Sequence, residues 1–287
     1  MISPADRRLF YFNVYGTGTI SIIYEDYYKY DKYQKGDLRM YTGNYECLEL
    51  FVKPDEGKKG SVLLKNVKES TTETKELKHI YGNWIKIPVS RNTEYEISTQ
   101  DCTITFAYLS ECENIMENGI CVLDTTDNYK EMNKEEFLHF IDTPYREQYH
   151  FSPVVNWNND PNGLCWFKGY YHLFYQLNPF AQEWNNMYWG HAASKDLVHW
   201  THLPVVLEPQ EEILDNLAIK GGAFSGSALP MGEEVYFYLT RHIGSQDDGW
   251  DTIQYQTMTK SSDMIHFEPE KEIIREKPEG TNYDFRD

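Results

Sequence analysis

A seven-residue pattern occurs twice in the second half of the sequence, and it limits the folds that the chain can adopt. Ser194–Trp200 reads SKDLVHW and Ser261–Phe267 reads SSDMIHF, so a serine, an aspartate, a histidine and an aromatic residue recur in register, 67 positions apart. Each copy follows an alternating apolar strand and precedes a turn with proline. A repeat of one supersecondary unit at a fixed period is typical of propeller blades, whereas sandwiches show no such period. Chance similarity of two strand–turn–strand units is the alternative.

The first part of the chain reads as a series of short strands separated by Gly, Lys, Asn and Asp turns. This rhythm predicts a β-sandwich-like domain over residues 1–112. Two polar segments, 54–60 and 68–75, are predicted loops. Because no catalytic cluster occurs in this region, we expect a packing or accessory domain, with carbohydrate binding as the alternative. The predicted strands are 9–15, 19–24, 45–52, 61–64, 84–89, 94–98 and 103–109.

A connector over residues 113–144 joins this region to a second domain over residues 145–287. We expect a short helix at 133–140 in the connector, with Asn133 as its N-cap and two glutamates in its first turn. At the period of the repeat, the second domain holds about two blades plus the start of a third, whereas a closed propeller has at least four. The chain is therefore predicted to be all-β, with a sandwich-like domain followed by an incomplete propeller.

Composition and charge exclude several classes of function. The sequence has 27 basic and 45 acidic residues, a net charge of −18, which repels nucleic acid and anionic membrane surfaces. Its five cysteines are widely spaced, and its histidines lack the spacing of a zinc site, so we expect reduced thiols, no metal and no cofactor. No signal peptide and no long apolar run is seen, which predicts a soluble, cytoplasmic protein.

The segment Trp157–Gly163, WNNDPNG, places a carboxylate between amide side chains. Taken alone, its Asp-Pro and Asn-Gly pairs are turn signatures. Three further clusters follow in order: LFYQ at 173–176 leading to Trp184 and WGHA at 189–192, FSGSA at 224–228, and FRD at 285–287. Together they resemble glycoside hydrolase family 32, the family of invertases, levanases and inulinases. The resemblance covers residues 150–287 and does not extend to residues 1–145.

The resemblance implies a five-bladed propeller and retaining cleavage of fructosyl bonds, which needs two carboxyl groups about 5 Å apart. Asp160 matches the nucleophile of the family, and Asp287 matches a carboxylate that stabilises the transition state. Gln176, Trp184 and Ser225 match sugar contacts, although a structural role in the core is the alternative for each of them. The complete set of implied substrate-binding residues is Trp157, Asn158, Asn159, Gln176, Trp184, Phe224, Ser225 and Arg286.

The general acid of the family is a glutamate in a Glu-Cys pair that follows the Arg-Asp pair, and this sequence ends at Asp287. Two upstream pairs, Glu46-Cys47 and Glu111-Cys112, are interpreted as coincidences. We therefore expect little or no turnover by this chain alone.

The predicted function is retaining hydrolysis of terminal β-fructosyl linkages in sucrose, fructo-oligosaccharides or fructans. The alternatives are fructosyl transfer, a non-catalytic fructan-binding protein, and a split enzyme that a complementing chain completes. Open propeller edges also favour self-association.

Overall fold

The computed structural model describes residues 12–14, 20–22, 38–125, 130–132, 134–142, 146–147, 150–245, 252–281 and 285–286. The chain separates into two compact units, residues 1–35 and residues 36–287. In the first unit, β1 (Phe12–Val14) pairs antiparallel with β2 (Ile20–Ile22), within two of the predicted strands. The rest of the described fold belongs to the second unit.

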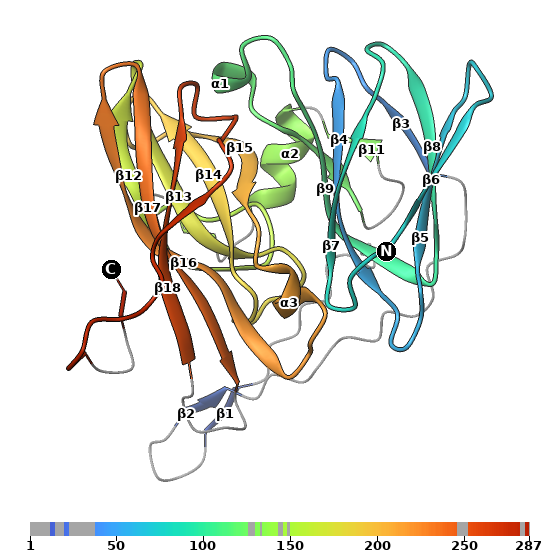
Figure 1. The fold of residues 1–287 in the computed structure, drawn as a ribbon. Coiled ribbons are helices and arrows are strands. Elements are labelled where there is room, and N and C mark those ends of the chain that lie inside the picture. Colours follow the sequence, from blue (N-terminus) through green and yellow to red (C-terminus); the bar gives the residue numbers. More distant parts are fainter. Residues whose placement is uncertain are drawn as a thin grey trace. The chain divides into compact units, whose positions relative to one another are not determined.

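Two antiparallel sheets form the predicted sandwich (Figure 1). One has the order β11-β10-β9-β4-β7 and the other the order β3-β8-β5-β6. Alternate side chains of β5 are buried, and Val62 and Leu64 meet Leu48, Leu50 and Ile87 of the opposite sheet in one apolar core. The strands are β3 (Leu38–Tyr41), β4 (Cys47–Pro54), β5 (Ser61–Asn66), β6 (Thr72–Glu76), β7 (Asn83–Pro88), β8 (Glu94–Gln100), β9 (Cys102–Ser110), β10 (Cys121–Asp124) and β11 (Lys130–Glu131).

The structure differs from the sequence-based expectation at three places in this region. Segment 68–75, predicted as a loop, contains most of β6, whose TETKE sequence is exposed on nearly all positions and so gives no apolar alternation. Charged edge strands of this kind protect a sheet against unwanted pairing. β3 was not predicted. The connector contributes β10 and β11 to the sandwich sheet besides the helices α1 (Ile115–Asn118) and α2 (Lys134–Ile141).

The predicted helix is thus confirmed as α2, whereas its predicted N-cap, Asn133, lies outside the described residues.

Two consecutive four-stranded antiparallel sheets form the blades, which we call blade I and blade II (Figure 1). Each SxDxxH copy lies between the third and fourth strand of its blade, so the repeat of the sequence is a structural repeat. Blade I contains β12 (Trp157–Phe167), β13 (Tyr170–Asn178), β14 (Tyr188–Ser194) and β15 (Trp200–Leu207). After α3 (Glu211–Leu214), blade II contains β16 (Ile219–Met231), β17 (Glu234–Ser245), β18 (Thr252–Ser261) and β19 (Lys271–Ile274).

The second strand of blade I is buried on both faces. On one face, Phe174 packs with Phe237 and Leu239 of blade II. Its odd-numbered side chains, Leu173, Tyr175 and Leu177, belong instead to a core shared with Phe51, Phe106 and Tyr108 of the sandwich. Blade I therefore lies between the sandwich and blade II. The division at residues 112 and 145 stays a prediction, because residues 36–287 form one compact unit.

The five cysteines are all free thiols, and burial raises the pKa of Cys47, Cys102 and Cys165 to about 11. No helix in the described part of the chain is both long enough and apolar enough to cross a membrane.

Candidate active site

The WNNDPNG segment lies in a strand, so the expectation of a tight turn is wrong. It forms the start of β12, the edge strand of blade I, and its register with β13 shifts between Asn158 and Pro161 and again between Asn162 and Cys165. Such bulges add a residue and redirect side chains. Pro161 is tolerated because an edge strand leaves one row of N–H groups unpaired. The Asp-Pro and Asn-Gly pairs therefore lie at two bulges, and the first bulge carries the carboxylate.

Asp160 lies within the first of these bulges, and its side chain is exposed. The Ser225 hydroxyl donates to Oδ2 of Asp160 at 3.3 Å. Ser225 itself lies in a register shift of β16, between Ala223 and Gly226. A Cβ at Gly226 would come 2.2 Å from the Tyr238 carbonyl oxygen, so this shift requires glycine. Irregular strands on two adjacent blades thus bring together a carboxylate and a hydroxyl that are 65 positions apart.

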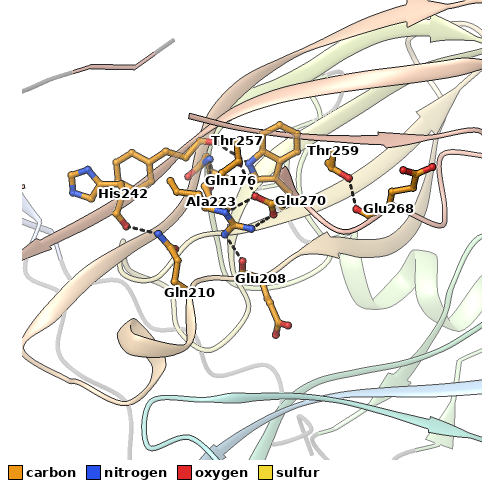
Figure 2. A network of polar contacts seen from close by, with 12 residues as sticks. Gln176, Glu208, Gln210, Ala223, His242, Thr257, Thr259, Glu268 and Glu270 are labelled. Carbon is orange, nitrogen blue, oxygen red and sulfur yellow. Dashed lines mark hydrogen bonds and ion pairs between the residues drawn. The ribbon is translucent and has the colours of Figure 1, made fainter. Parts of the chain in front are cut away.

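Buried side chains of blade I hold β16 in this position. Nε2 of Gln176 donates to the Ala223 carbonyl oxygen at 2.7 Å, and the Trp189 indole donates to the Phe224 carbonyl oxygen at 3.0 Å. Figure 2 shows Gln176 pointing at Ala223. With its amide oriented to satisfy its neighbours, Asn162 accepts from Nε2 of Gln176 at 3.2 Å. Since Gln176 is only 2% exposed, its observed role is to support the strand that carries Ser225, and its predicted contact with sugar stays a prediction.

Phe224 brings three other groups together. Its ring lies 6.3 Å from that of Trp184, and the Arg286 guanidinium carbon lies 5.8 Å from its centroid. His242 stacks flat on Phe224 with centroids 4.2 Å apart. Trp184 is 37% exposed and so offers an apolar face to solvent. No sequence pattern pointed to His242, because its contact with Phe224 depends on the irregular register of β16.

The remaining predicted residues fall into two groups. The Trp157 indole donates to Oδ1 of Asn159 at 2.8 Å, so these two side chains bind one another, and Asn158 is half-buried beside them. Asp287 lies outside the described residues. Among the described residues, no group of three or more His, Cys, Asp or Glu side chains could hold a metal ion.

A cleft of about 940 Å³ lies away from this site. It is lined by residues of the sandwich, the connector and blade I, among them Tyr45, Phe137, Phe151 and Trp200. None of the predicted site residues lines it. We therefore place the site by its chemical groups rather than by the size of the cavity.

An exposed carboxylate that accepts from a serine hydroxyl, with that serine next to Phe224 and its cluster of rings, is an arrangement suited to binding and attacking a sugar. Residues 150–287 match the family model for the Glycosyl hydrolases family 32 N-terminal domain. This part of the chain is therefore similar to the N-terminal domain of glycosyl hydrolase family 32.

Known relatives agree with this assignment. The chain is 39% identical over 159 residues to a sucrose-6-phosphate hydrolase of Zymomonas mobilis, which is 55% of this chain and 30% of that protein. It is 54% identical over 90 residues to a levanase of Bacillus subtilis, 31% of this chain and 12% of the levanase. The chain thus spans about a third or less of these relatives.

A solved structure extends the likeness beyond the family match. The glycoside hydrolase family 32 structure from Bifidobacterium adolescentis has a TM-score of 0.80 at 33% identity, over 88% of this chain and 42% of that chain. Residues 150–287 make up less than half of the sequence, so this coverage includes residues before 150. The expectation that the resemblance stops at about residue 145 is therefore wrong at the level of the fold.

Proposed function

We propose that the site around Asp160 binds a terminal β-fructosyl unit and that the Asp160 carboxylate attacks its anomeric carbon in a retaining hydrolysis. The observation that carries this proposal is the contact between the exposed Asp160 carboxylate and the Ser225 hydroxyl, at the junction of two blades. Sucrose-6-phosphate hydrolase and levanase among the relatives agree with a fructosyl substrate. Sucrose, fructo-oligosaccharides and fructans are the substrates that we propose.

Each group near Asp160 has a proposed role in this reaction. The Ser225 hydroxyl orients the carboxylate through its hydrogen bond. The exposed ring of Trp184 stacks on the apolar face of the sugar. Arg286 lies against Phe224 and orients the adjacent Asp287, which accepts hydrogen bonds from ring hydroxyls as positive charge develops in the transition state. Asn158 and Asn159 donate to other hydroxyl groups of the fructosyl unit.

The nucleophilic step can be tested without any proton donor. β-Fructosyl fluoride carries a leaving group that departs as fluoride with the electron pair of the C–F bond, so it needs no general acid. Attack by Asp160 would form an ester to the anomeric carbon and release one fluoride ion. We expect mass spectrometry to find one fructosyl adduct on the peptide that contains Asp160, and none after Asp160→Asn.

The outcome separates this proposal from its alternatives. A binding protein would show heat with sucrose or fructo-oligosaccharides in calorimetry but no adduct with the fluoride. An adduct that sugar hydroxyls resolve faster than water does would indicate fructosyl transfer, which product analysis detects. Fluoride release that Asp160→Asn leaves unchanged would contradict the assignment of the nucleophile, with Asp196→Asn as the control for loss of another exposed aspartate.

We further propose that the chain associates through the exposed edge of blade II. β19 is the last strand of its sheet, and all four of its residues are exposed, including Ile273 and Ile274. Unpaired strand edges are templates for association. We expect light scattering to show concentration-dependent dimers or larger species, which Ile273→Lys reduces. A monomer at all concentrations would contradict this expectation.

A further inference from the structure

His242 packs against Phe224, the aromatic residue that precedes Ser225. It belongs to β17, where its register partners are Gly222 on β16 and Gln254 on β18. Its imidazole ring is nearly parallel to that of Phe224, with an interplanar angle of 4° and centroids 4.2 Å apart. Figure 2 shows the His242 main chain held from the other side, where its carbonyl oxygen accepts from Gln210 at 3.4 Å. The ring of Phe224 therefore rests on a side chain whose backbone is fixed.

The hydrogen bonds of Gln254 determine which nitrogen of His242 carries the proton. The Phe285 N–H donates to Oε1 of Gln254, and a backbone N–H can only donate. The amide oxygen of Gln254 must therefore face Phe285, which leaves Nε2 of Gln254 to donate to Nδ1 of His242 at 3.0 Å. Nδ1 acts as an acceptor, so the neutral ring carries its proton on Nε2.

A second glutamine holds the same segment. Nε2 of Gln256 donates to the Phe285 carbonyl oxygen at 2.7 Å, while its own oxygen accepts from the Thr240 hydroxyl at 3.1 Å. Two side chains of β18 thus bind the main chain of Phe285 at both its N–H and its carbonyl. The next residue, Arg286, has its guanidinium carbon 5.8 Å from the Phe224 centroid. The contacts form a closed path from Phe224 through His242, Gln254 and Phe285 to Arg286 and back to Phe224.

We propose that His242 is a positioning residue that couples the Phe224–Ser225 segment to the Phe285–Arg286 segment. Its ring fixes Phe224 by stacking, and its Nδ1 fixes the Gln254 amide that holds Phe285. The two segments that contact the fructosyl unit then take up their positions together. The role in sugar binding rests on the proposed function, whereas the coupling of the two segments can be measured without any sugar.

The coupling is tested by nuclear magnetic resonance on the full chain. We expect the imidazole spectrum of His242 to show an unprotonated Nδ1 and a protonated Nε2 at neutral pH, and Gln254→Leu to abolish this preference. We also expect His242→Ala to accelerate exchange of the Phe285 amide hydrogen about tenfold, the effect of losing a hydrogen bond worth about 1.4 kcal/mol. His199→Ala, on an exposed turn, is the control and should leave this rate unchanged.

A comparison of two substitutions separates the ring from its hydrogen bond. His242→Phe keeps a flat ring against Phe224 but removes the acceptor for Gln254. It should restore most of the sucrose affinity that His242→Ala loses, about tenfold by calorimetry, while Phe285 exchange stays fast. A role of His242 in general stability alone would instead change both measurements in parallel with the melting temperature.

Failure of the proposed function and failure of the coupling can be told apart. If the wild-type chain binds neither sucrose nor fructo-oligosaccharide, the proposed function is wrong, and the tautomer and the exchange rate still decide on the coupling. A protonated Nδ1 at neutral pH, or Phe285 exchange that His242→Ala does not alter, would overturn the positioning role.

Discussion

At the scale of single residues, Glu49 is a buried carboxylate that three hydrogen-bond donors surround. It is 2% exposed, and it accepts from the Trp84 indole at 2.8 Å, the Tyr108 hydroxyl at 2.9 Å and the Ser110 hydroxyl at 2.6 Å. The Tyr108 oxygen in turn accepts from the Val205 N–H at 3.1 Å, which belongs to blade I. Glu49 therefore organises polar groups of the sandwich at its boundary with the first blade.

Replacing Glu49 should be costly because its donors would be buried without an acceptor. We expect Glu49→Ala to lower the free energy of unfolding by about 3 kcal/mol in urea titrations, since each buried donor left unsatisfied costs about 1–3 kcal/mol. Glu49→Gln keeps an acceptor and should cost less. As a control, Glu73→Ala removes an exposed glutamate of β6 and should change stability by less than about 0.5 kcal/mol. Equal stability of Glu49→Ala and wild type would refute this account.

The structure shows contacts of the candidate site residues that the sequence did not predict. Asp160 was expected on a turn and lies in a bulge, because both conformations favour the same Pro, Asn and Gly residues. Gln176 was expected to touch sugar, which stays a prediction, and its observed contact is with the Ala223 carbonyl oxygen. His242 was missed entirely, since its stacking on Phe224 depends on the register of two strands and no local pattern records it.

At the scale of elements, adjacent strands of blade I bury two histidines against each other. His172 on β13 is 2% exposed and His191 on β14 is 0% exposed, and Nδ1 of His172 lies 3.0 Å from Nε2 of His191. Burial lowers the pKa of His172 to about 4 and that of His191 well below its usual value. Unfolding therefore releases both rings to bind protons in water at mildly acidic pH.

This pair should make stability depend on pH. Below the unfolded pKa of about 6.5, the unfolded chain binds more protons than the folded chain, so the free energy of unfolding falls as the pH falls towards about 4. Each histidine contributes about 1.4 kcal/mol per pH unit in that window. We expect the melting temperature to drop between pH 7 and pH 5, and His172→Gln to make this drop shallower. An identical slope in the variant would show that other groups cause it.

The two copies of the SxDxxH repeat use the same hydrogen bonds. Oδ1 of Asp196 accepts from the N–H groups of Val198 and His199, and Oδ1 of Asp263 accepts from the equivalent groups of Ile265 and His266. In both turns the other oxygen lies 2.7 Å from Nδ1 of the histidine. The residues that recur in the sequence therefore stabilise the turn between the last two strands of each blade.

Because the turns are equivalent, their substitutions should have equivalent effects. We expect Asp196→Ala and Asp263→Ala each to lower the free energy of unfolding by a similar amount, because each removes the acceptor of two backbone hydrogen bonds in its turn. Ser262→Ala, at a position whose side chain does not take part in the turn pattern, is the matched control. If one aspartate proved much more costly than the other in urea unfolding, the repeat would not be a structural equivalence.

Strands with an apolar face were predictable, and strands without one were not. β5 carries buried alternate residues, β9 is buried at most of its positions, and both were predicted nearly at their observed bounds. β6 has charged and hydroxyl side chains on both faces, so only its pairing with β5 defines it as a strand. Pairing depends on residues distant in sequence, which a local pattern cannot report.

At the scale of the whole molecule, the sandwich contributes directly to the core that supports the blades. Phe51 of β4 is fully buried and contacts the rings of Phe180 and Tyr188, at 6.0 and 5.9 Å between centroids. The Tyr81 hydroxyl donates to Asn178, the last residue of β13, at 3.2 Å. The sandwich thus packs against one face of blade I, and blade II covers the opposite face.

A shared core predicts that residues 36–287 unfold as one cooperative unit. Val62→Ala alters only the core between the two sandwich sheets, where Val62 is fully buried, and should cost about 2 kcal/mol. In a single unit, the slowest amide hydrogens of β13 and β14 should then exchange faster by the same factor as those of β4, roughly 30-fold. Leu239→Ala, in the core between the blades, should accelerate exchange in β4 in the same way.

If the sandwich and the two blades unfolded independently, each substitution would accelerate exchange only in the part that contains it. Calorimetry would then resolve two transitions. Phe51→Ala distinguishes cooperative from independent unfolding most directly, because it removes a ring that packs with both the sandwich and blade I. We expect this variant to unfold in a single transition, with a free energy of unfolding about 3–5 kcal/mol lower than that of the wild type, as other buried Phe→Ala substitutions show. Two separate transitions in this variant, where the wild type has one, would mean that the shared aromatic core is what makes the sandwich and the blades a single cooperative structure.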